Sequence, residues 1–345
     1  MRGSHREGIV LGKVSEIKSA EKKSNGTLDR LKKLLINSGA LVALVLLCLF
    51  LSILSPDFLT VNNIMNIARQ SSINGLVSAG MLLVILTAGT DLSVGSILAF
   101  SSALMGISVV HWGVNPLFSI LLCLATGSLI GWINGLILTE LHVPHPFIST
   151  MGSMNVFRGL TLIIMNATPI SGMPKSVKFI GAEFIGIVPV SFMLLLIVYV
   201  IFHFLLKNTT IGRHIYAVGG NIEAARLSGI DVKKVLWLVY SFSGFMSALA
   251  GIVLAGRVDS VYPLAGTGYE LDAIASVIIG GASFFGGIGS IWGTLVGVLI
   301  MGVLRNGLNL LNVSSNLQSV AIGLVIVAAV CVDVFRQRTL VKNNK

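Results

Sequence analysis

Charged side chains are scarce in this sequence, because only 11% of its 345 residues are Asp, Glu, Lys or Arg. An ordinary soluble domain has roughly 25% charged residues. With 54% hydrophobic residues, the chain has too little polar surface to cover its apolar mass in water. The scarcity of charge excludes a soluble globular protein and predicts an all-α integral membrane protein.

Motifs for metal binding and catalysis are also absent. The three cysteines, Cys48, Cys123 and Cys331, lie in separate apolar runs without Cys/His ligand spacing, so no metal is expected. The sequence has no GxxxxGK[ST] phosphate loop, and any ATP-driven work is therefore expected from another chain. The absence of HExxH and GxSxG motifs argues against a membrane-embedded enzyme. The net charge of +10 lies in the tails and one loop without interleaved aromatic residues, so no nucleic acid is expected.

Long apolar stretches dominate what is present. The candidate spans lie near residues 36–55, 75–90, 94–112, 116–140, 146–168, 188–206, 236–255, 271–287, 291–311 and 317–335. Since a span needs about 20 residues, the short, glycine-rich stretches at 75–90 and 271–287 are either extended by flanking helix or broken and re-entrant. We therefore expect eight to ten spans.

Lysine and arginine predict the orientation. Of the 24 basic residues, nine lie before residue 34, five lie between residues 207 and 234, and four lie after residue 335. Cytoplasmic segments of membrane proteins carry the excess of Lys and Arg. We expect a cytoplasmic tail at 1–35, a membrane domain at 36–335 with a cytoplasmic loop at 207–234, and a cytoplasmic tail at 336–345.

The basic loop contains Glu223-Ala224-Ala225 and, four positions later, Gly229. This pattern resembles the EAA motif of ATP-binding-cassette (ABC) importer permeases, in which a short cytoplasmic helix docks into a groove on a separate ATPase. We expect a helix from Asn221 to Gly229, with both alanines forming a narrow docking face and Gly229 turning the chain. Glu223 and Arg226 would bond across the interface. An ordinary amphipathic loop helix is the alternative.

Other segments extend the resemblance over almost the whole chain. They are DLSVGS (91–96), PFISTMGSMNVFRG (146–159), GGNIEAARLSGI (219–230), AGTGYELDAIA (265–275), GGIGSIWGT (286–294) and NGLNLLNVSS (306–315). In order and spacing they resemble the monosaccharide permease family of bacterial ABC importers, and the ribose-type permeases look most similar.

The resemblance implies a type II ABC importer-like permease in the bacterial inner membrane, surrounded by lipid and paired with a second copy of itself. Its further partners would be an ATPase subunit that uses ATP and Mg²⁺, a periplasmic sugar-binding protein, and a monosaccharide substrate. Ribose is favoured, with allose, xylose, galactose and inositol left open. An ion- or proton-coupled secondary transporter is the alternative function, but the titratable groups that it needs inside the bundle are scarce here.

Amide side chains are the candidates for the substrate pathway, because amides offer donors and acceptors to hydroxyl groups without a charge. Four share one helical face, and two lie near the end of the ninth span: Asn63, Asn66, Gln70 and Asn74, and Asn306 and Asn309. The alternative is that these amides hold helices together or face water.

Charges at membrane depth are few, and each must face protein, water or an interface: Arg69, Asp91, Glu140, Arg158, Asp272 and Arg305. Asp91 is expected to cap the helix that follows it, with Ser93 and Gly95 in the same structural or gating segment; direct substrate contact is the alternative.

Arg158 is expected to pair with a carboxylate of another helix or to reach the membrane interface. Arg257, Asp259 and Glu270 flank a loop that we expect to face the periplasm. They are candidates for docking the binding protein, and solvated loop charges are the alternative.

Overall fold

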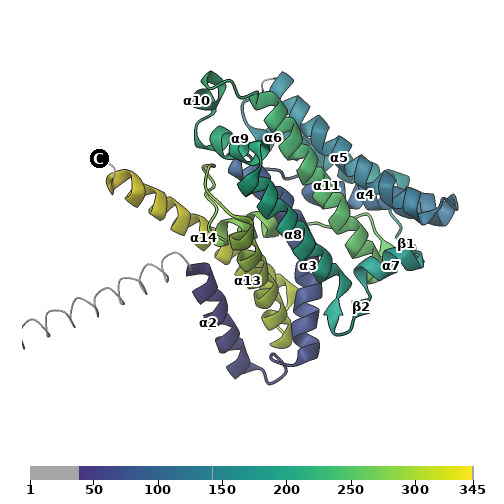
Figure 1. Ribbon diagram of the computed structural model, residues 1–345. Coiled ribbons are helices and arrows are strands. Elements are labelled where there is room, and N and C mark those ends of the chain that lie inside the picture. Colours follow the sequence, from purple (N-terminus) through teal and green to yellow (C-terminus); the bar gives the residue numbers. More distant parts are fainter. Residues whose placement is uncertain (1–38, 142, 344–345) are drawn as a thin grey trace, which may run out of the picture.

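The computed structural model describes residues 39–141 and 143–343, so the predicted basic tail at 1–35 lies outside the described residues. Within them the chain is a bundle of helices with four very short strands (Figure 1). The helices are α2 (Gly39–Leu54), α3 (Val61–Leu86), α4 (Val94–Gly106), the π-helix η1 (Ile107–His111), α5 (Pro116–Glu140), α6 (Pro146–Ile164), α7 (Lys175–Gly181), α8 (Val190–Asn208), α9 (Thr210–Gly220), α10 (Ile222–Leu227), α11 (Val232–Val258), α12 (Tyr269–Ile279), α13 (Ile291–Leu310) and α14 (Ser315–Asn343). The strands are β1 (Ile170–Ser171), β2 (Phe184–Ile185), β3 (Val188–Pro189) and β4 (Ser260–Val261), with β1 antiparallel to β4 and β2 antiparallel to β3.

The all-α prediction is confirmed, and every predicted apolar stretch contains a helix. Seven of the described helical segments are long and apolar enough to cross a membrane: α3, α4 with η1, α5, α6, α8, α11 and α13. α2 and the first part of α14 are shorter apolar helices. The predicted stretch at 271–287 coincides with α12, which ends at Ile279 and continues as a non-helical loop to Ser290. The structure therefore selects the broken segment from the two alternatives for this stretch.

The other short stretch, predicted at 75–90, is extended by flanking helix. α3 begins at Val61, after Thr60, whose hydroxyl accepts a hydrogen bond from the backbone N–H of Asn63 at 3.4 Å. The amides of this segment lowered its apparent hydropathy, so the predicted start was too late. In the structure, 83% of the most apolar window of α3 is buried inside the protein. Most residues in that part of α3 therefore face other helices rather than lipid.

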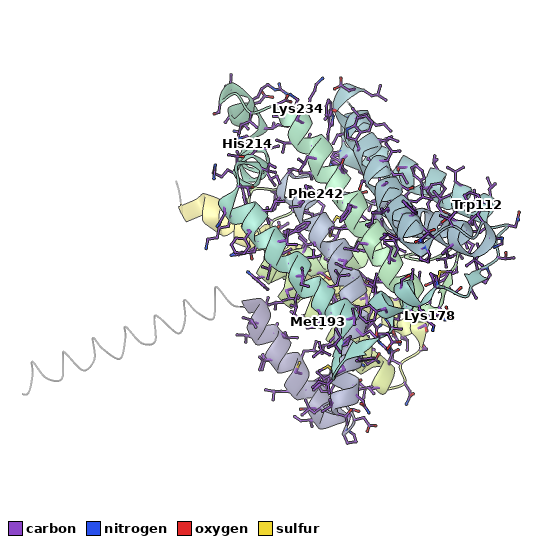
Figure 2. The ribbon with its side chains drawn as sticks, turned by 45° about the vertical axis from the view of Figure 1, so that its right-hand side comes forward. Trp112, Lys178, Met193, His214, Lys234 and Phe242 are labelled. Atoms are coloured by element: carbon purple, nitrogen blue, oxygen red, sulfur yellow. The ribbon has the colours of Figure 1, made fainter. Side chains whose placement is uncertain are left out.

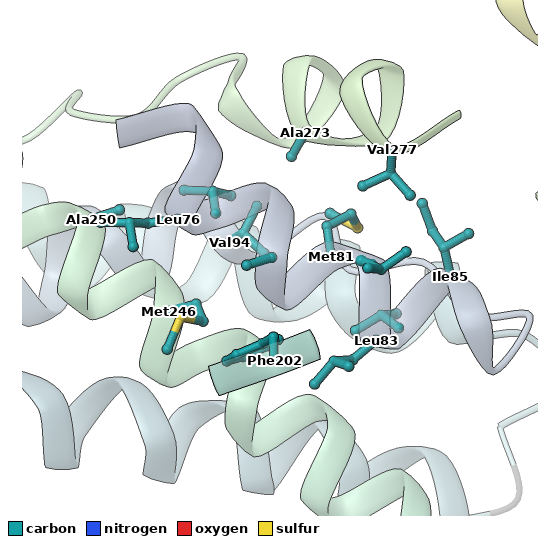
Figure 3. Close-up of a cluster of buried hydrophobic side chains, with 14 of the residues drawn as sticks. Leu76, Met81, Leu83, Ile85, Val94, Phe202, Met246, Ala250, Ala273 and Val277 are labelled. Atoms are coloured by element: carbon teal, nitrogen blue, oxygen red, sulfur yellow. The ribbon is translucent and has the colours of Figure 1, made fainter. Parts of the chain in front are cut away.

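α3 is the centre of the bundle, and α8, α11, α12 and α13 pack around it. Figure 3 shows Met81 and Ile85 of α3 beside Ala273 and Val277 of α12 in the main hydrophobic cluster. Burying such side chains away from water or lipid head groups gives this part of the fold its fixed arrangement.

Glycines hold α5 against α11, the most extensive helix pair in the bundle. A Cβ atom placed on Gly131 would lie 2.1 Å from the carbonyl oxygen of Tyr240, and one on Gly244 would lie 2.0 Å from the carbonyl oxygen of Gly127. Small residues allow such close backbone contact in membranes. Only glycine fits at these positions without moving one helix.

The two ends of the bundle differ in structure. α9 and α10 lie at one end, called here the α9–α10 end, and α7 with the β2–β3 hairpin lies at the other, called here the α7 end (Figure 1). Figure 2 places His214 and Lys234 at the α9–α10 end and Lys178 near the α7 end. The predicted basic loop therefore forms one end of the molecule.

Two non-helical segments that interrupt the bundle both contact α9. One separates α3 from α4, and the other is the loop at 280–290. The backbone N–H of Gly287 donates to the carbonyl oxygen of Leu86 at 2.9 Å, and the Tyr216 hydroxyl of α9 donates to the carbonyl oxygen of Gly289 at 2.8 Å. A Cβ atom on Gly219 of α9 would clash with the same Leu86 carbonyl. α9 thus rests directly on both interruptions.

Candidate functional site

The EAA-like motif forms the short helix α10, directly after α9. The side-chain oxygen of Asn221 accepts a hydrogen bond from the N–H of Ala224 at 3.0 Å and so caps the helix. Gly229 follows the helix with φ of 82°, in the left-handed region that glycine adopts without strain. Glu223 and Arg226 are exposed and pair with each other at 3.3 Å. The helix and its final turn lie where the sequence predicts them.

The orientation of α10 corrects one detail of the prediction. Ala225 is only 4% exposed and packs against Val218 of α9 and Val232 of α11. The expectation that both alanines face a partner is therefore wrong for Ala225, which attaches α10 to its own chain, whereas Ala224 is exposed. The apolar side chain that projects furthest is Leu227, which is 88% exposed. Sequence reasoning missed it, although an apolar residue in a polar loop helix was a usable signal.

The amides predicted for the substrate pathway connect helices. Asn63 and Asn306 exchange two side-chain hydrogen bonds, at 3.0 and 2.7 Å, between α3 and α13. The Asn74 amide donates to the Ser276 hydroxyl of α12 at 3.0 Å. These pairs fasten the central helix to its neighbours, which is the alternative role considered for them.

The remaining amides of that set have different surroundings. Asn66 accepts a hydrogen bond from Arg69, one turn further along α3, at 3.3 Å. Asn309 accepts one from Gln318 of α14 at 2.8 Å. Gln70 lines a small polar cavity together with Asn74. Gln70 and Asn74 thus line one cavity, whereas Asn66 and Asn309 bond the side chains of Arg69 and Gln318.

Asp91 is fully buried at the interruption between α3 and α4. Its carboxylate accepts hydrogen bonds from the backbone N–H and hydroxyl of Ser93, at 3.0 and 2.5 Å, and from the Ser243 hydroxyl of α11 at 2.7 Å. The Asn134 amide of α5 donates to the Ser93 hydroxyl at 2.9 Å. Ser93 stands at the N-cap position of α4 but makes no side-chain capping bond, whereas the Asp91 carboxylate accepts the backbone N–H of Ser93 at the start of this helix, as the sequence predicts. The same carboxylate also joins the interruption to α11 and, through Ser93, to α5.

Arg158 and Gly95 both contact the loop that precedes α12. The Arg158 guanidinium donates to the carbonyl oxygens of Pro263 and Ala265, at 3.0 and 2.8 Å. The Glu270 carboxylate of α12 also lies close enough to attract this guanidinium, which agrees with the predicted carboxylate of another helix. A Cβ atom on Gly95 would clash with the carbonyl oxygen of Gly266. The loop before α12 is therefore held against α4 and α6.

Of the residues predicted to dock a partner protein, Arg257 and Asp259 lie beside α7, whereas Glu270 lies beside Gly95 at the start of α4. Asp259, at φ of 55°, bonds Lys178 at 2.7 Å and the N–H of Met173 at 2.8 Å. The hydrogen bond from Lys178 lowers the pKa of the Asp259 carboxyl below its ordinary value. Glu270 accepts from the N–H of Gly268 at 3.2 Å, and Arg257 is half-buried in the last turn of α11. Asp259 thus contributes to the local fold.

Across residues 39–141 and 143–343, no group of three or more His, Cys, Asp or Glu side chains is placed to hold a metal ion.

Comparison with known proteins gives consistent results. Residues 63–330 match the family described as "branched-chain amino acid transport system / permease component". The chain is 47% identical over 297 residues to the ribose import permease protein of Bacillus subtilis (strain 168), covering 86% of this chain and 92% of that protein. It is 43% identical over 298 residues to the D-allose transport system permease protein of Escherichia coli (strain K12), covering 86% and 90% of the two chains.

A third relative, the fructose import permease protein of Rhizobium meliloti, is 36% identical over 344 residues, covering 95% of this chain and 94% of that protein. No solved structure matches the chain significantly. The matches extend over the whole helical bundle rather than over one segment of it. This chain, an all-α integral membrane permease, belongs to the family of permease components of branched-chain amino acid transport systems.

Proposed function

We propose that this chain is the membrane-spanning permease subunit of an ABC importer that translocates a monosaccharide, with ribose favoured. The observation that carries the proposal is the identity of 47% and 43% to permeases named for ribose and D-allose, over nearly their whole length. Identity to the permease named for fructose is lower, at 36%. The sequence segments that resemble ribose-type permeases support the same substrate.

The proposed partners follow from what this chain lacks and from the shape of its ends. Since the sequence has no phosphate loop, a separate ATPase subunit supplies hydrolysis with ATP and Mg²⁺. It docks on α10. The Leu227 side chain of this helix is 88% exposed, and Glu223 and Arg226 of the same helix form an exposed ion pair. A second copy of the chain completes the membrane unit, and a periplasmic sugar-binding protein docks at the α7 end.

The proposed orientation places the α9–α10 end and both termini in the cytoplasm of a bacterium, with the bundle crossing the inner membrane. Five basic residues lie between positions 207 and 234, which include α9 and α10. The positive-inside rule assigns such a segment to the cytoplasmic side. A docking helix must also lie on the side where ATP is available.

The test is reconstitution of the chain into proteoliposomes with its ATPase and a ribose-binding protein. We expect uptake of labelled ribose that needs all three proteins and ATP, with weaker uptake when allose and fructose replace ribose. The chain alone is the control, and it should neither hydrolyse ATP nor accumulate sugar. Uptake by the chain alone, driven by a proton or sodium gradient, would instead establish a secondary transporter and refute the proposal.

A further inference from the structure

A groove lies where α8 ends and α13 begins, next to α9. Its volume is about 220 Å³, much more than the roughly 10–15 Å³ that one water-sized sphere occupies. The residues that line it are His203, Leu206 and Lys207 of α8, Tyr216 of α9, and Ser290 and Ile291 at the start of α13. Both Lys207 and Ser290 are exposed, so the groove opens to the surface of the bundle.

The groove lies at the edge of the apolar part of the bundle. α8 runs from the β2–β3 hairpin to α9 (Figure 1), and it is the most apolar of the seven candidate spans, with a mean hydropathy of 2.3. Its only charged residue, Lys207, lies in its last turn. α13, another candidate span, begins at Ile291. Since basic residues at the ends of spans lie at the level of the lipid head groups, the groove lies at that level too.

An exposed apolar stripe of α8 leads to the groove. Met193, Ile197, Val200 and Phe204 are all exposed, and each follows the previous one by three or four positions. Lys207 continues this spacing, so the stripe and the lysine share one face of the helix. An exposed apolar face of a membrane-spanning helix lies against lipid tails. A lipid tail that follows this stripe therefore ends beside Lys207.

The Lys207 ammonium is not neutralised by a carboxylate, unlike the lysines of α11 at the same end of the molecule. Lys233 pairs with Glu140 and Lys234 pairs with Asp231, each at 3.0 Å. Lys207 has no ion pair or hydrogen bond within residues 39–141 and 143–343, and none of the residues lining the groove is acidic. Its positive charge is therefore available to an anion from outside the chain.

Ser290 places a second donor at the groove. Its hydroxyl oxygen accepts a hydrogen bond from the N–H of Gly293 at 3.1 Å, and its proton is donated to no group in the described part of the chain. Because Ser290 is exposed, an outside acceptor can reach that proton. An ammonium and a hydroxyl donor together suit an anion with several oxygen atoms, such as a phosphate group.

An aromatic pair flanks the groove. Trp292 follows Ile291, is 41% exposed, and its ring centroid lies 6.0 Å from that of His203. Tryptophan is enriched at the head-group level of membranes, where one part of the ring is apolar and another is wet. Donors for an anion thus lie beside an interfacial tryptophan and at the end of an apolar stripe. This combination fits an anionic amphiphile better than a free ion.

We propose that this groove binds an anionic phospholipid, with its phosphate held by Lys207 and Ser290 and one acyl chain along the exposed stripe of α8. In the proposed orientation the lipid belongs to the cytoplasmic leaflet. Basic pockets between membrane helices hold anionic head groups in this way. The inference goes beyond the transport of a sugar, because it requires only that the chain spans a membrane.

The test compares two lysine substitutions at the same end of the molecule. Lys207→Gln removes the ammonium group at the groove, and the matched control Lys234→Gln removes one that pairs with Asp231 instead. Native mass spectrometry of the purified full chain measures the binding of phosphatidylglycerol and of phosphatidylethanolamine with identical acyl chains. The first lipid carries a net negative charge and the second carries none.

We expect Lys207→Gln to weaken the binding of phosphatidylglycerol by about three- to tenfold, the size expected for one basic residue at an anionic membrane surface. Lys234→Gln, and Lys207→Arg, which keeps the charge, should stay within about twofold of the parent chain. Binding of phosphatidylethanolamine should be weaker and the same in all variants. Equal losses in the two glutamine variants, or equal binding of the two lipids by the parent chain, would overturn the site.

Inorganic phosphate distinguishes a lipid from a free ion. At millimolar concentration it should not displace phosphatidylglycerol, because it lacks the contact with the apolar stripe of α8. Displacement that depends on Lys207 would assign the groove to a soluble anion. Weaker ATPase binding or self-association of Lys207→Gln, with lipid binding unchanged, would assign the groove to a protein contact. Either result refutes the lipid site.

A second measurement uses the chain in lipid vesicles. Bromine atoms on acyl chains quench the fluorescence of nearby tryptophans, and the contribution of Trp292, one of four tryptophans, is obtained by subtracting the signal of Trp292→Phe. Brominated phosphatidylglycerol should quench Trp292 more strongly than brominated phosphatidylethanolamine. Lys207→Gln should remove this difference, and Lys234→Gln should keep it. Equal quenching of Trp292 by the two lipids in the parent chain refutes the lipid site.

Discussion

Leu227 provides a direct test of the docking helix, because its replacement by alanine should weaken the ATPase complex without harming the permease. The side chain is 88% exposed in the isolated chain and lies at the end of α10. Truncating it therefore deletes almost no apolar surface that is buried within the folded permease. The neighbouring Ala225, at 4% exposure, is the opposite case, because enlarging it to Trp would disturb the contact of α10 with α9 and α11.

The expected size of the effect follows from burial. Fully burying a leucine side chain at an interface contributes about 1.5 to 3 kcal/mol. Since about 1.4 kcal/mol corresponds to a factor of ten in affinity, Leu227→Ala should weaken ATPase association by about ten- to hundredfold. The thermal stability of the isolated permease should change by less than about 0.5 kcal/mol, as is usual for an exposed position.

The assay is titration of detergent-solubilised permease with purified ATPase for affinity, and sugar uptake is measured after the same proteins are reconstituted into proteoliposomes. The matched control is Leu264→Ala, which removes a leucine that is 60% exposed in the loop before α12. This control should bind the ATPase as the parent chain does. Parent-like affinity and uptake in Leu227→Ala would refute α10 as the ATPase contact, whatever the behaviour of Ala225→Trp.

Three further predictions concern orientation, pH and packing. The first uses whole cells that express a chain whose native cysteines are replaced. A membrane-impermeant thiol reagent should label the variant Lys175→Cys and should not label Arg213→Cys; labelling at 213 contradicts the proposed topology. Lys178→Met removes the hydrogen bond that lowers the pKa of Asp259 from its ordinary 3.8, and a carboxyl with a lowered folded-state pKa stabilises only above that pKa. The variant should therefore melt at a lower temperature than the parent near pH 7, and this difference should shrink as the pH falls below 3.8 and vanish once the pH is below the lowered pKa of Asp259; a difference that stays constant through this fall would exclude the ion pair as its cause. Gly131→Val should destabilise the chain by about 3 kcal/mol or more, since even a Cβ atom there would lie 2.1 Å from a carbonyl oxygen of α11; an unchanged melting temperature would contradict the α5–α11 packing.

The sequence predicted the helical stretches because apolar composition alone identifies them. It offered a break within 271–287 as one of two alternatives, because five glycines lie from Gly280 to Gly289, and the structure selected that alternative. The start of α3 was missed because hydropathy treats Asn63 and Asn74 as surface residues, whereas here they pair with Asn306 and Ser276. Such pairs join positions more than 200 residues apart, and one sequence contains no local signal of them.

The direction in which side chains point was the other property that the sequence did not predict. In a helix as short as α10, composition does not determine which side faces the chain, so Ala225 and Leu227 could not be separated before the structure placed α9 and α11 beside them. The link from Asp91 to α11 was likewise hidden, because its Ser243 partner lies 152 positions away. Chemical type was readable from the sequence, whereas partners required the fold.

The pairing of Asn63 with Asn306 has a consequence for how the protein is made. The two residues are 243 positions apart, and the Ser276 partner of Asn74 is 202 positions away. At a synthesis rate of about 5 to 20 residues per second, roughly 12 to 50 s pass between the appearance of Asn63 and that of its partner. During that interval α3, which is largely buried in the finished protein, carries amides whose partners have not yet been made. A nascent chain that stops before residue 276 therefore presents α3 without either of these partners.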